Sequence, residues 1–144
     1  MTAPSITLIG NLTADPELRF TPSGKAVANF TIVTSKSVKG ADGKWTDEQT
    51  VFWRCVVWGT TAENVAESLQ KGDSVIAQGN PEQKSYEKKV DGGEPVKVTY
   101  MELTVWNLGP DLKRWSVKVD RVKRTAQEAP VDDPWANAGD EPPF

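Results

Sequence analysis

The chain has 144 residues and a formal net charge of −3 at pH 7, and its composition excludes several kinds of function. It has no histidine and one cysteine, which excludes histidine-based triads, His-type metal sites, cysteine metal clusters and an intrachain disulfide. No apolar stretch approaches the roughly 18 residues of a membrane span, and the start lacks a basic segment followed by an apolar run. We therefore expect a soluble, cytoplasmic protein without cofactor or metal, in a reducing compartment.

The charge is unevenly distributed along the chain. Residues 125–144 hold five acidic residues and no base, so residues 1–124 carry all 17 Lys and Arg against 15 Asp and Glu, a net +2. The acidic balance comes from the tail and does not argue against a polyanionic ligand for the rest. We expect a folded domain over 1–124 and a disordered tail over 125–144, whose Ala, Pro, Asp and Glu cannot bury enough apolar area to fold.

The first half of the chain is typical of strands joined by turns. Residues 6–12 predict a first strand, and a Pro and Gly turn at 21–24 precedes a second strand over 26–35. In that second strand Ala28, Phe30 and Ile32 form the expected core face. Residues 37–47, with two glycines and two lysines, predict a mobile hairpin connection.

The stretch Thr50–Gly59 predicts a strand with two different faces. Alternation places Val51, Trp53, Cys55 and Val57 on a uniformly apolar face, which we expect in the core. The other face carries Phe52, Arg54, Val56 and Trp58. Two aromatics that bracket a guanidinium suit stacking on unpaired bases and contact with phosphates. The alternative is that Phe52 and Trp58 pack under a loop or a partner subunit.

A helix and further strands follow. Thr60-Thr61-Ala62-Glu63 has the spacing of a capping box, and Gly72 is expected to close the helix. Residues 73–79 predict a strand, and residues 80–95 predict two strand arms joined by a turn. Here Pro81 requires an edge or a bulge.

Two more strands are predicted before the tail. Residues 96–106 form a long strand, in which the apolar alternation changes near Tyr100 and Met101 and so suggests a bulge. Residues 115–119 predict a final short strand.

Five strands with a helix between the third and fourth are typical of the OB-fold, an all-β class with one short helix and a five-stranded Greek-key barrel. Here an extended hairpin arm and the disordered acidic tail are added. Several motifs, in their order and spacing, resemble the bacterial-type single-stranded DNA-binding proteins (SSBs). They are Ile9-Gly10-Asn11-Leu12, Asp15-Pro16-Glu17-Leu18-Arg19, Gly24 to Phe30, Phe52 to Gly59, Ala62-Glu63 with Leu69-Gln70-Lys71-Gly72, and the acidic Pro-Pro-Phe end. Gly109-Pro110-x-Leu112 resembles the actinobacterial branch or a phage of such hosts, and the sequence leaves chromosomal and phage origin open.

The resemblance implies a non-enzymatic homotetramer that binds and protects single-stranded DNA, whatever its sequence, in replication, recombination and repair. The implied DNA-binding positions are Phe52, Trp58 and Tyr86 for stacking, and Arg54, Lys71, Lys84 and Thr31 for the phosphates and the groove. The implied docking tip for replication, recombination and repair proteins is Asp140, Glu141, Pro142, Pro143 and Phe144. An acidic tail of this kind could instead keep the chain soluble or occupy its own basic groove.

Some positions depart from the family pattern. Val38 stands where a fourth stacking residue is usual, and whether Trp45 replaces it stays open. Thr60 and Glu82 stand where basic residues are usual, so we expect weaker binding with a shallower salt dependence. Asn80-Pro81 replaces a run that is normally part of a regular strand, which leaves the geometry of that arm open.

Two functions of other classes remain as alternatives. One is an OB-fold adaptor with weak or lost DNA binding, which the small charge of the domain and the departures favour. The other is a nuclease that uses clustered carboxylates such as Asp15 and Glu17. Turn formation and strand-edge charge explain those two acids without catalysis.

Overall fold

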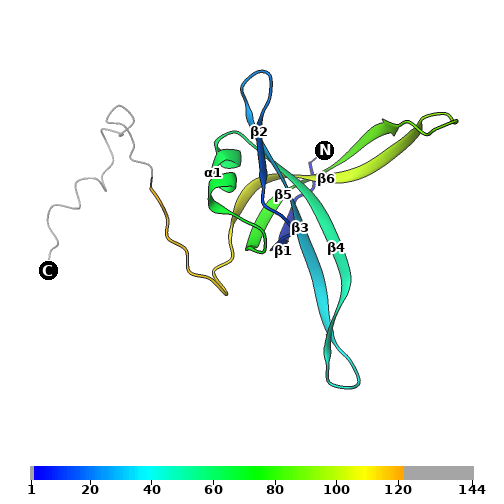
Figure 1. Cartoon of the computed structure of the whole chain (residues 1–144). Helices are drawn as coiled ribbons and strands as arrows, with labels where there is room; N and C mark the ends of the chain where they lie inside the picture. Colours follow the sequence, from blue (N-terminus) through cyan, green and yellow to red (C-terminus); the bar gives the residue numbers. More distant parts are fainter. Residues whose placement is uncertain (1, 122–144) are drawn as a thin grey trace, which may run out of the picture.

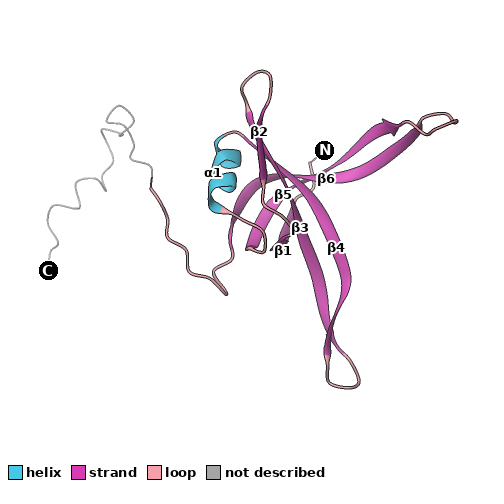
Figure 2. Cartoon of the chain, viewed as in Figure 1, coloured by secondary structure: helices cyan, strands magenta, loops and turns pink. Residues whose placement is uncertain are grey.

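A computed structural model of the chain describes residues 2–121, which carry six strands and one helix. The elements, drawn in Figure 1 and Figure 2, are β1 (Ile6–Leu12), β2 (Glu17–Phe20), β3 (Ala26–Lys39), β4 (Trp45–Trp58), α1 (Thr60–Ser68), β5 (Ser74–Lys88) and β6 (Val96–Pro110). No helix in this described part is long and apolar enough to cross a membrane. The predicted domain end at residue 124, the tail over 125–144 and its docking tip lie outside the described residues.

Five of the strands close into a barrel. Strands β1, β5, β6, β4 and β3 are hydrogen-bonded in that order, and a second pairing of β1 with β3 completes the ring. The pairings are antiparallel except that of β4 with β6, which is parallel where Arg54 lies beside Glu102. Strand β2 adds to the edge of β3, and α1 connects β4 to β5. This architecture confirms the OB-fold predicted from the sequence.

Two long hairpins project from the barrel in different directions (Figure 1). The β3–β4 arm stays paired as far as Lys39 opposite Trp45, so much of the predicted mobile connection over 37–47 is ordered strand. A register shift between Thr34 and Lys36 marks the place where this arm leaves the barrel. The β5–β6 arm continues to Lys88 opposite Val96. The predicted projecting hairpin is therefore present, but residues 80–95 hold only its first arm and the turn, and its second arm is β6.

The core lies inside the barrel and under α1, and alternation along the strands predicted most of it. Ala28, Phe30 and Ile32 of β3 are buried, as are Cys55 and Val57 of β4. Burial raises the pKa of the Cys55 thiol from its ordinary value of 9.0 to about 12, so the thiol stays protonated.

Two residues of β4 differ from the predicted faces. Val51, expected in the core, is 42% exposed because it lies opposite Thr34, where the arm leaves the barrel. Val56, expected on the wet face, is buried, and it lies between Asn29 of β3 and Thr104 of β6. Side chains on both neighbouring strands cover so small a residue in the middle of a sheet.

The predicted helix is present, but both of its end signals were misread. It begins at Thr60, so Gly59 is the N-cap, and no side-chain cap bond forms there in the described structure. The capping box therefore does not operate. Leu69, in an extended conformation, follows the last helical residue. Gly72, with φ 91°, instead serves the turn into β5, where its N–H donates to the Leu12 carbonyl.

The register of β5 with β6 shifts between Gln78 and Gly79, and Trp106 is the extra residue opposite this step. The predicted bulge near Tyr100 and Met101 is therefore misplaced. Gly79 is required here because a Cβ would collide with the Thr104 carbonyl oxygen. Pro81 lies beyond Gly79, the last β5 residue that pairs with β1. Strand β5 is thus an edge at Pro81, as the sequence required.

The predicted final strand over 115–119 is wrong. Residues 111–121 contain no strand, and Trp115, Val117 and Val119 are exposed. Strand β6 ends at Pro110, and the next N–H, that of Asp111, still donates to the Ser74 carbonyl of β5. Residues 112–121 pair with no strand of the described chain. Alternation alone predicted a strand here, but a strand also needs a neighbour to supply its hydrogen bonds.

Candidate nucleic-acid interface

The outer face of β4 carries aromatic and cationic side chains toward solvent. Phe52 is 65% exposed and Trp58 is 41% exposed, and Arg54 lies exposed between them along the strand. Thr31 of β3 lies directly opposite Arg54. Because opposed residues of an antiparallel pair share a face, Thr31 belongs to the same surface. We call this surface the outer face. Besides Phe52, Arg54 and Trp58 of β4, it includes the residues of β3, β5 and β6 that the sheet register places beside them.

Tyr86 joins the outer face from the β5–β6 arm. It is 49% exposed, and its ring centroid lies 6.0 Å from that of Tyr100 on β6, with 60° between the ring planes. The guanidinium carbon of Arg54 lies 5.0 Å from the centroid of the same Tyr100 ring, which is a cation–π geometry. Tyr100 therefore links the arm to the barrel. Sequence reasoning missed this role, because the pairing of β4 with β6 brings Tyr100 there.

The Trp58 end of the outer face has cations of its own. Lys25 Nζ lies 5.1 Å from the centroid of the Trp58 ring. Arg19 of β2 is opposite Val27 of β3, which is opposite Trp58, so register places all three on one row. Sequence reasoning did not select Lys25 or Arg19, since Lys25 belongs to a turn and no strand was predicted at β2.

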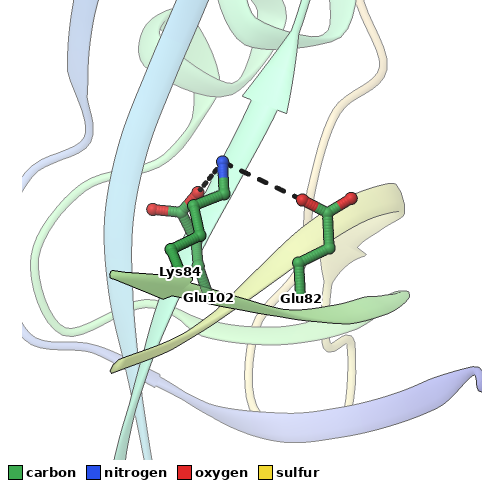
Figure 3. Close-up of polar contacts among 3 residues, drawn as sticks. All are labelled: Glu82, Lys84 and Glu102. Carbon is green, nitrogen blue, oxygen red and sulfur yellow. Dashed lines mark ion pairs between the residues drawn. The ribbon is translucent and has the colours of Figure 1, made fainter. Parts of the chain in front are cut away.

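Lys84 lies on the outer face but is paired with acids. Its Nζ is 3.2 Å from Glu102 Oε1 and 3.9 Å from Glu82 Oε2 (Figure 3). The hydrogen bond and charge of Glu102 raise the pKa of Lys84, so the ammonium stays protonated. Lys84 and Tyr100 are opposed in the β5–β6 register, and Glu102 is beside Arg54. The ion pair between Lys84 and Glu102 therefore lies beside Tyr100 and Arg54.

A groove of about 300 Å³ opens on the outer face beside Arg54. Its lining is of mixed polarity and brings three carboxylates near one guanidinium. The lining residues are Thr13, Ala14, Asp15, Glu17, Asn29, Phe30, Thr31, Arg54, Cys55 and Glu102. A polyanion that crosses this groove meets attraction from Arg54 and repulsion from the acids.

Lys71 lies at one side of this groove rather than among the aromatics. It is exposed in the turn before β5, and its backbone N–H donates to Asp15 Oδ1 at 2.8 Å. That bond ties the turn to the loop that follows β1. Asp15 therefore has a structural role, in line with the non-catalytic explanation that the sequence offered for it.

At the far end of the β3–β4 arm, Val38 and Trp45 belong to neighbouring cross-strand pairs. Val38 is opposite Thr46, and the neighbouring pair is Lys39 opposite Trp45. Adjacent pairs of a ladder point to opposite sides, so Val38 and Trp45 face different sides of the arm. Trp45 is 68% exposed. A base stacked on Trp45 would therefore lie across the arm from one stacked at position 38.

Over residues 2–121 no group of three or more His, Cys, Asp or Glu side chains is placed to hold a metal ion. What the outer face does bring together is exposed rings with guanidinium and ammonium groups beside them. This arrangement can stack planar groups and contact anions.

Comparisons with known proteins agree with this chemistry. The model of the single-strand binding protein family matches residues 4–110. The chain is 42% identical to a single-stranded DNA-binding protein of Mycolicibacterium smegmatis, over 97% of each chain. It is 46% identical to one of Paenarthrobacter aurescens, over 92% of this chain and 85% of that one. Its structure resembles the crystal structure of the small single-stranded DNA-binding protein from Streptomyces coelicolor. The TM-score is 0.64 at 25% identity, and the match covers 80% of this chain and all of the other.

Proposed function

Because the chain belongs to the single-strand binding protein family, we propose that its outer face binds single-stranded DNA whatever the base sequence. Proteins of this family bind DNA and are not enzymes, which agrees with the expectation of no catalysis from the sequence. The observation that carries the proposal is the row of exposed rings, Phe52, Trp58 and Tyr86, with Arg54 between them.

Stacking supplies the sequence-tolerant part of the binding. Every base has a π-face, and each base stacked on an aromatic side chain contributes about 1 to 3 kcal/mol. Phe52 and Trp58 come from the barrel and Tyr86 comes from the arm. A strand that contacts all three follows β4 and crosses to the β5–β6 arm, with Tyr100 beside its path.

Cationic groups accompany the rings along this path. Arg54, Lys71 and Lys84 are the phosphate contacts carried over from the family, and Thr31 offers a hydroxyl beside Arg54. Lys25 supplies a further cation at Trp58. Each phosphate contact contributes about −0.7 to the slope of log affinity against log salt on single strands. A few contacts therefore give a modest salt dependence.

We further propose that copies of the chain assemble into a homotetramer. The edge of β1 that does not pair with β5 is open along residues 6–9. Ile9 of β1 and Ile76 of β5 are opposed, and they are 60% and 41% exposed. An open strand edge beside exposed aliphatic side chains favours association between copies.

The cellular role is proposed from the family and from the acidic end. We assign the chain to replication, recombination and repair in the cytoplasm, at the nucleoid or, for a viral gene, in the host. Asp140 to Phe144 would recruit partner proteins by placing an aromatic ring in a pocket with a basic rim. This segment lies outside the described residues, and its sequence alone supports the assignment.

A protein-binding adaptor is the second candidate. The observation that favours it is the set of acids on the outer face, where Glu82 and Glu102 hold Lys84 and three carboxylates line the groove. An adaptor would use the same face to bind a protein rather than DNA.

Fluorescence anisotropy of a labelled oligo(dT) distinguishes the two. We expect the protein to bind the single strand tightly, and an unlabelled duplex of mixed sequence to compete poorly. Affinity should rise with oligonucleotide length until the strand contacts the outer face of every protomer that it can reach in the assembly. Absence of binding at low salt would refute the proposed function and leave the adaptor.

A further inference from the structure

Glu102 occupies the centre of the outer face and is only partly solvated. Its side chain is 16% exposed. In the sheet it lies between Arg54 of β4 and Glu82 of β5. A carboxylate in this position faces any strand that runs from Phe52 to Tyr86.

Lys84, one of the cations of this face, is already paired with carboxylates. Its ammonium is closer to Glu102 than to Glu82, at 3.2 Å and 3.9 Å (Figure 3). A carboxylate oxygen and a phosphate oxygen seek the same N–H donors in the same geometry. A phosphate oxygen can therefore take all the N–H donors of Lys84 only by displacing Glu102. The displaced carboxylate keeps its negative charge and repels the phosphate.

We propose that Glu102 is an internal competitor of the DNA phosphates for Lys84, and that it sets the affinity and the salt dependence of the outer face. This inference rests on the proposed single-strand binding. In this proposal Glu102 weakens DNA binding and is not a further contact to the DNA. The same competition gives a physical reason to expect weaker binding from Glu82, at a usually basic position: Glu82 is a second, more distant partner for the same ammonium.

We expect the pair to contribute only modestly to stability. Lys84 is 41% exposed in its side chain, and ion pairs at such positions contribute little to stability. Gln keeps the shape of Glu and removes the charge, so Glu102→Gln should leave the barrel intact. Glu87→Gln is the matched control: it removes the same charge from the same arm. Glu87 neighbours Tyr86 along β5 and therefore points to the opposite side of the ribbon.

The experiment is an oligo(dT) titration of both variants and the wild type at several salt concentrations. Freeing the Lys84 ammonium for a phosphate about 5 Å away, at an effective dielectric constant between about 40 and 80, corresponds to roughly 4- to 17-fold tighter binding for Glu102→Gln. The slope of log affinity against log salt should steepen by about 0.7, because Lys84 can then neutralise a phosphate. Glu87→Gln should change affinity by less than about twofold.

A double-variant cycle tests whether Glu102 acts through Lys84. In a Lys84→Gln background, Glu102→Gln should give a distinctly smaller gain in affinity, because only the direct repulsion between Glu102 and the phosphate is then removed. Weaker or unchanged binding by the single Glu102→Gln variant would overturn the proposal, and so would a full gain in affinity without Lys84. Wild type that fails to bind oligo(dT) would instead refute the proposed function itself.

Discussion

Phe52 and Trp53 are neighbours in sequence on opposite faces of β4, so truncating each in turn separates binding from folding. Phe52 is 65% exposed. About a third of an area on the order of 200 Å² is therefore buried, and at about 25 cal/mol per Å² this contributes at most about 2 kcal/mol. Trp53 packs against the core, and its Nε1–H donates to Thr34 Oγ1 at 2.9 Å.

We expect Phe52→Ala to lower the free energy of unfolding by about 1 kcal/mol and to weaken oligo(dT) binding by about 1 to 3 kcal/mol, which is roughly 5- to 150-fold in Kd. Trp53→Ala should lower the free energy of unfolding by about 3 to 5 kcal/mol and, while folded, should bind almost as well as wild type. Urea unfolding at one fixed protein concentration and anisotropy titrations measure the two quantities. If Phe52→Ala binds normally, or if it unfolds as readily as Trp53→Ala, the assignment of the outer face is wrong.

Three other predictions concern the tip, the buried thiol and the barrel. Deleting Asp140 to Phe144 should leave oligo(dT) affinity unchanged or slightly higher but abolish binding of partner proteins in pull-downs; a large loss of DNA affinity would rule out a docking tip. The Cys55 thiol ionises near pH 9.0 when unfolded but near 12 when folded, so above pH 9.0 the unfolded state loses a proton that the folded state keeps. Stability should therefore fall as pH rises, by up to about 1.4 kcal/mol per pH unit, and a fall equally steep in Cys55→Ala would contradict this origin. Gly79→Ala places a Cβ against the Thr104 carbonyl and should lower the free energy of unfolding by about 1 to 3 kcal/mol, whereas Gly93→Ala, with no atom within 4 Å, should change it little.

Alternation was a good guide to most positions of β4 in the barrel. It placed Cys55 and Val57 in the core and Phe52 in solvent correctly. It failed at Val51, where the arm leaves the barrel, and at Val56, which neighbouring strands cover. Both failures depend on register and on the bend of the sheet, which a single strand's sequence does not contain.

The centre of the candidate site was harder to predict from the sequence. The family motif pointed to Lys84 and Arg54, but not to the partners that they have in the structure. Glu102 meets Lys84, and Tyr100 meets Arg54, only because β6 lies between β4 and β5. These contacts join segments far apart in the chain, and local patterns carry no information about them.

Quenching of tryptophan fluorescence by oligo(dT) tests the central claim, that bases stack on the outer face, most directly. Trp58 is 41% exposed on this face, so wild type should show strong quenching that saturates with added strand. Trp58→Ala should lose much of the quenching and bind more weakly by about 1 to 3 kcal/mol. Undiminished quenching and affinity in Trp58→Ala, or no quenching of the wild type at low salt, would contradict stacking on this face.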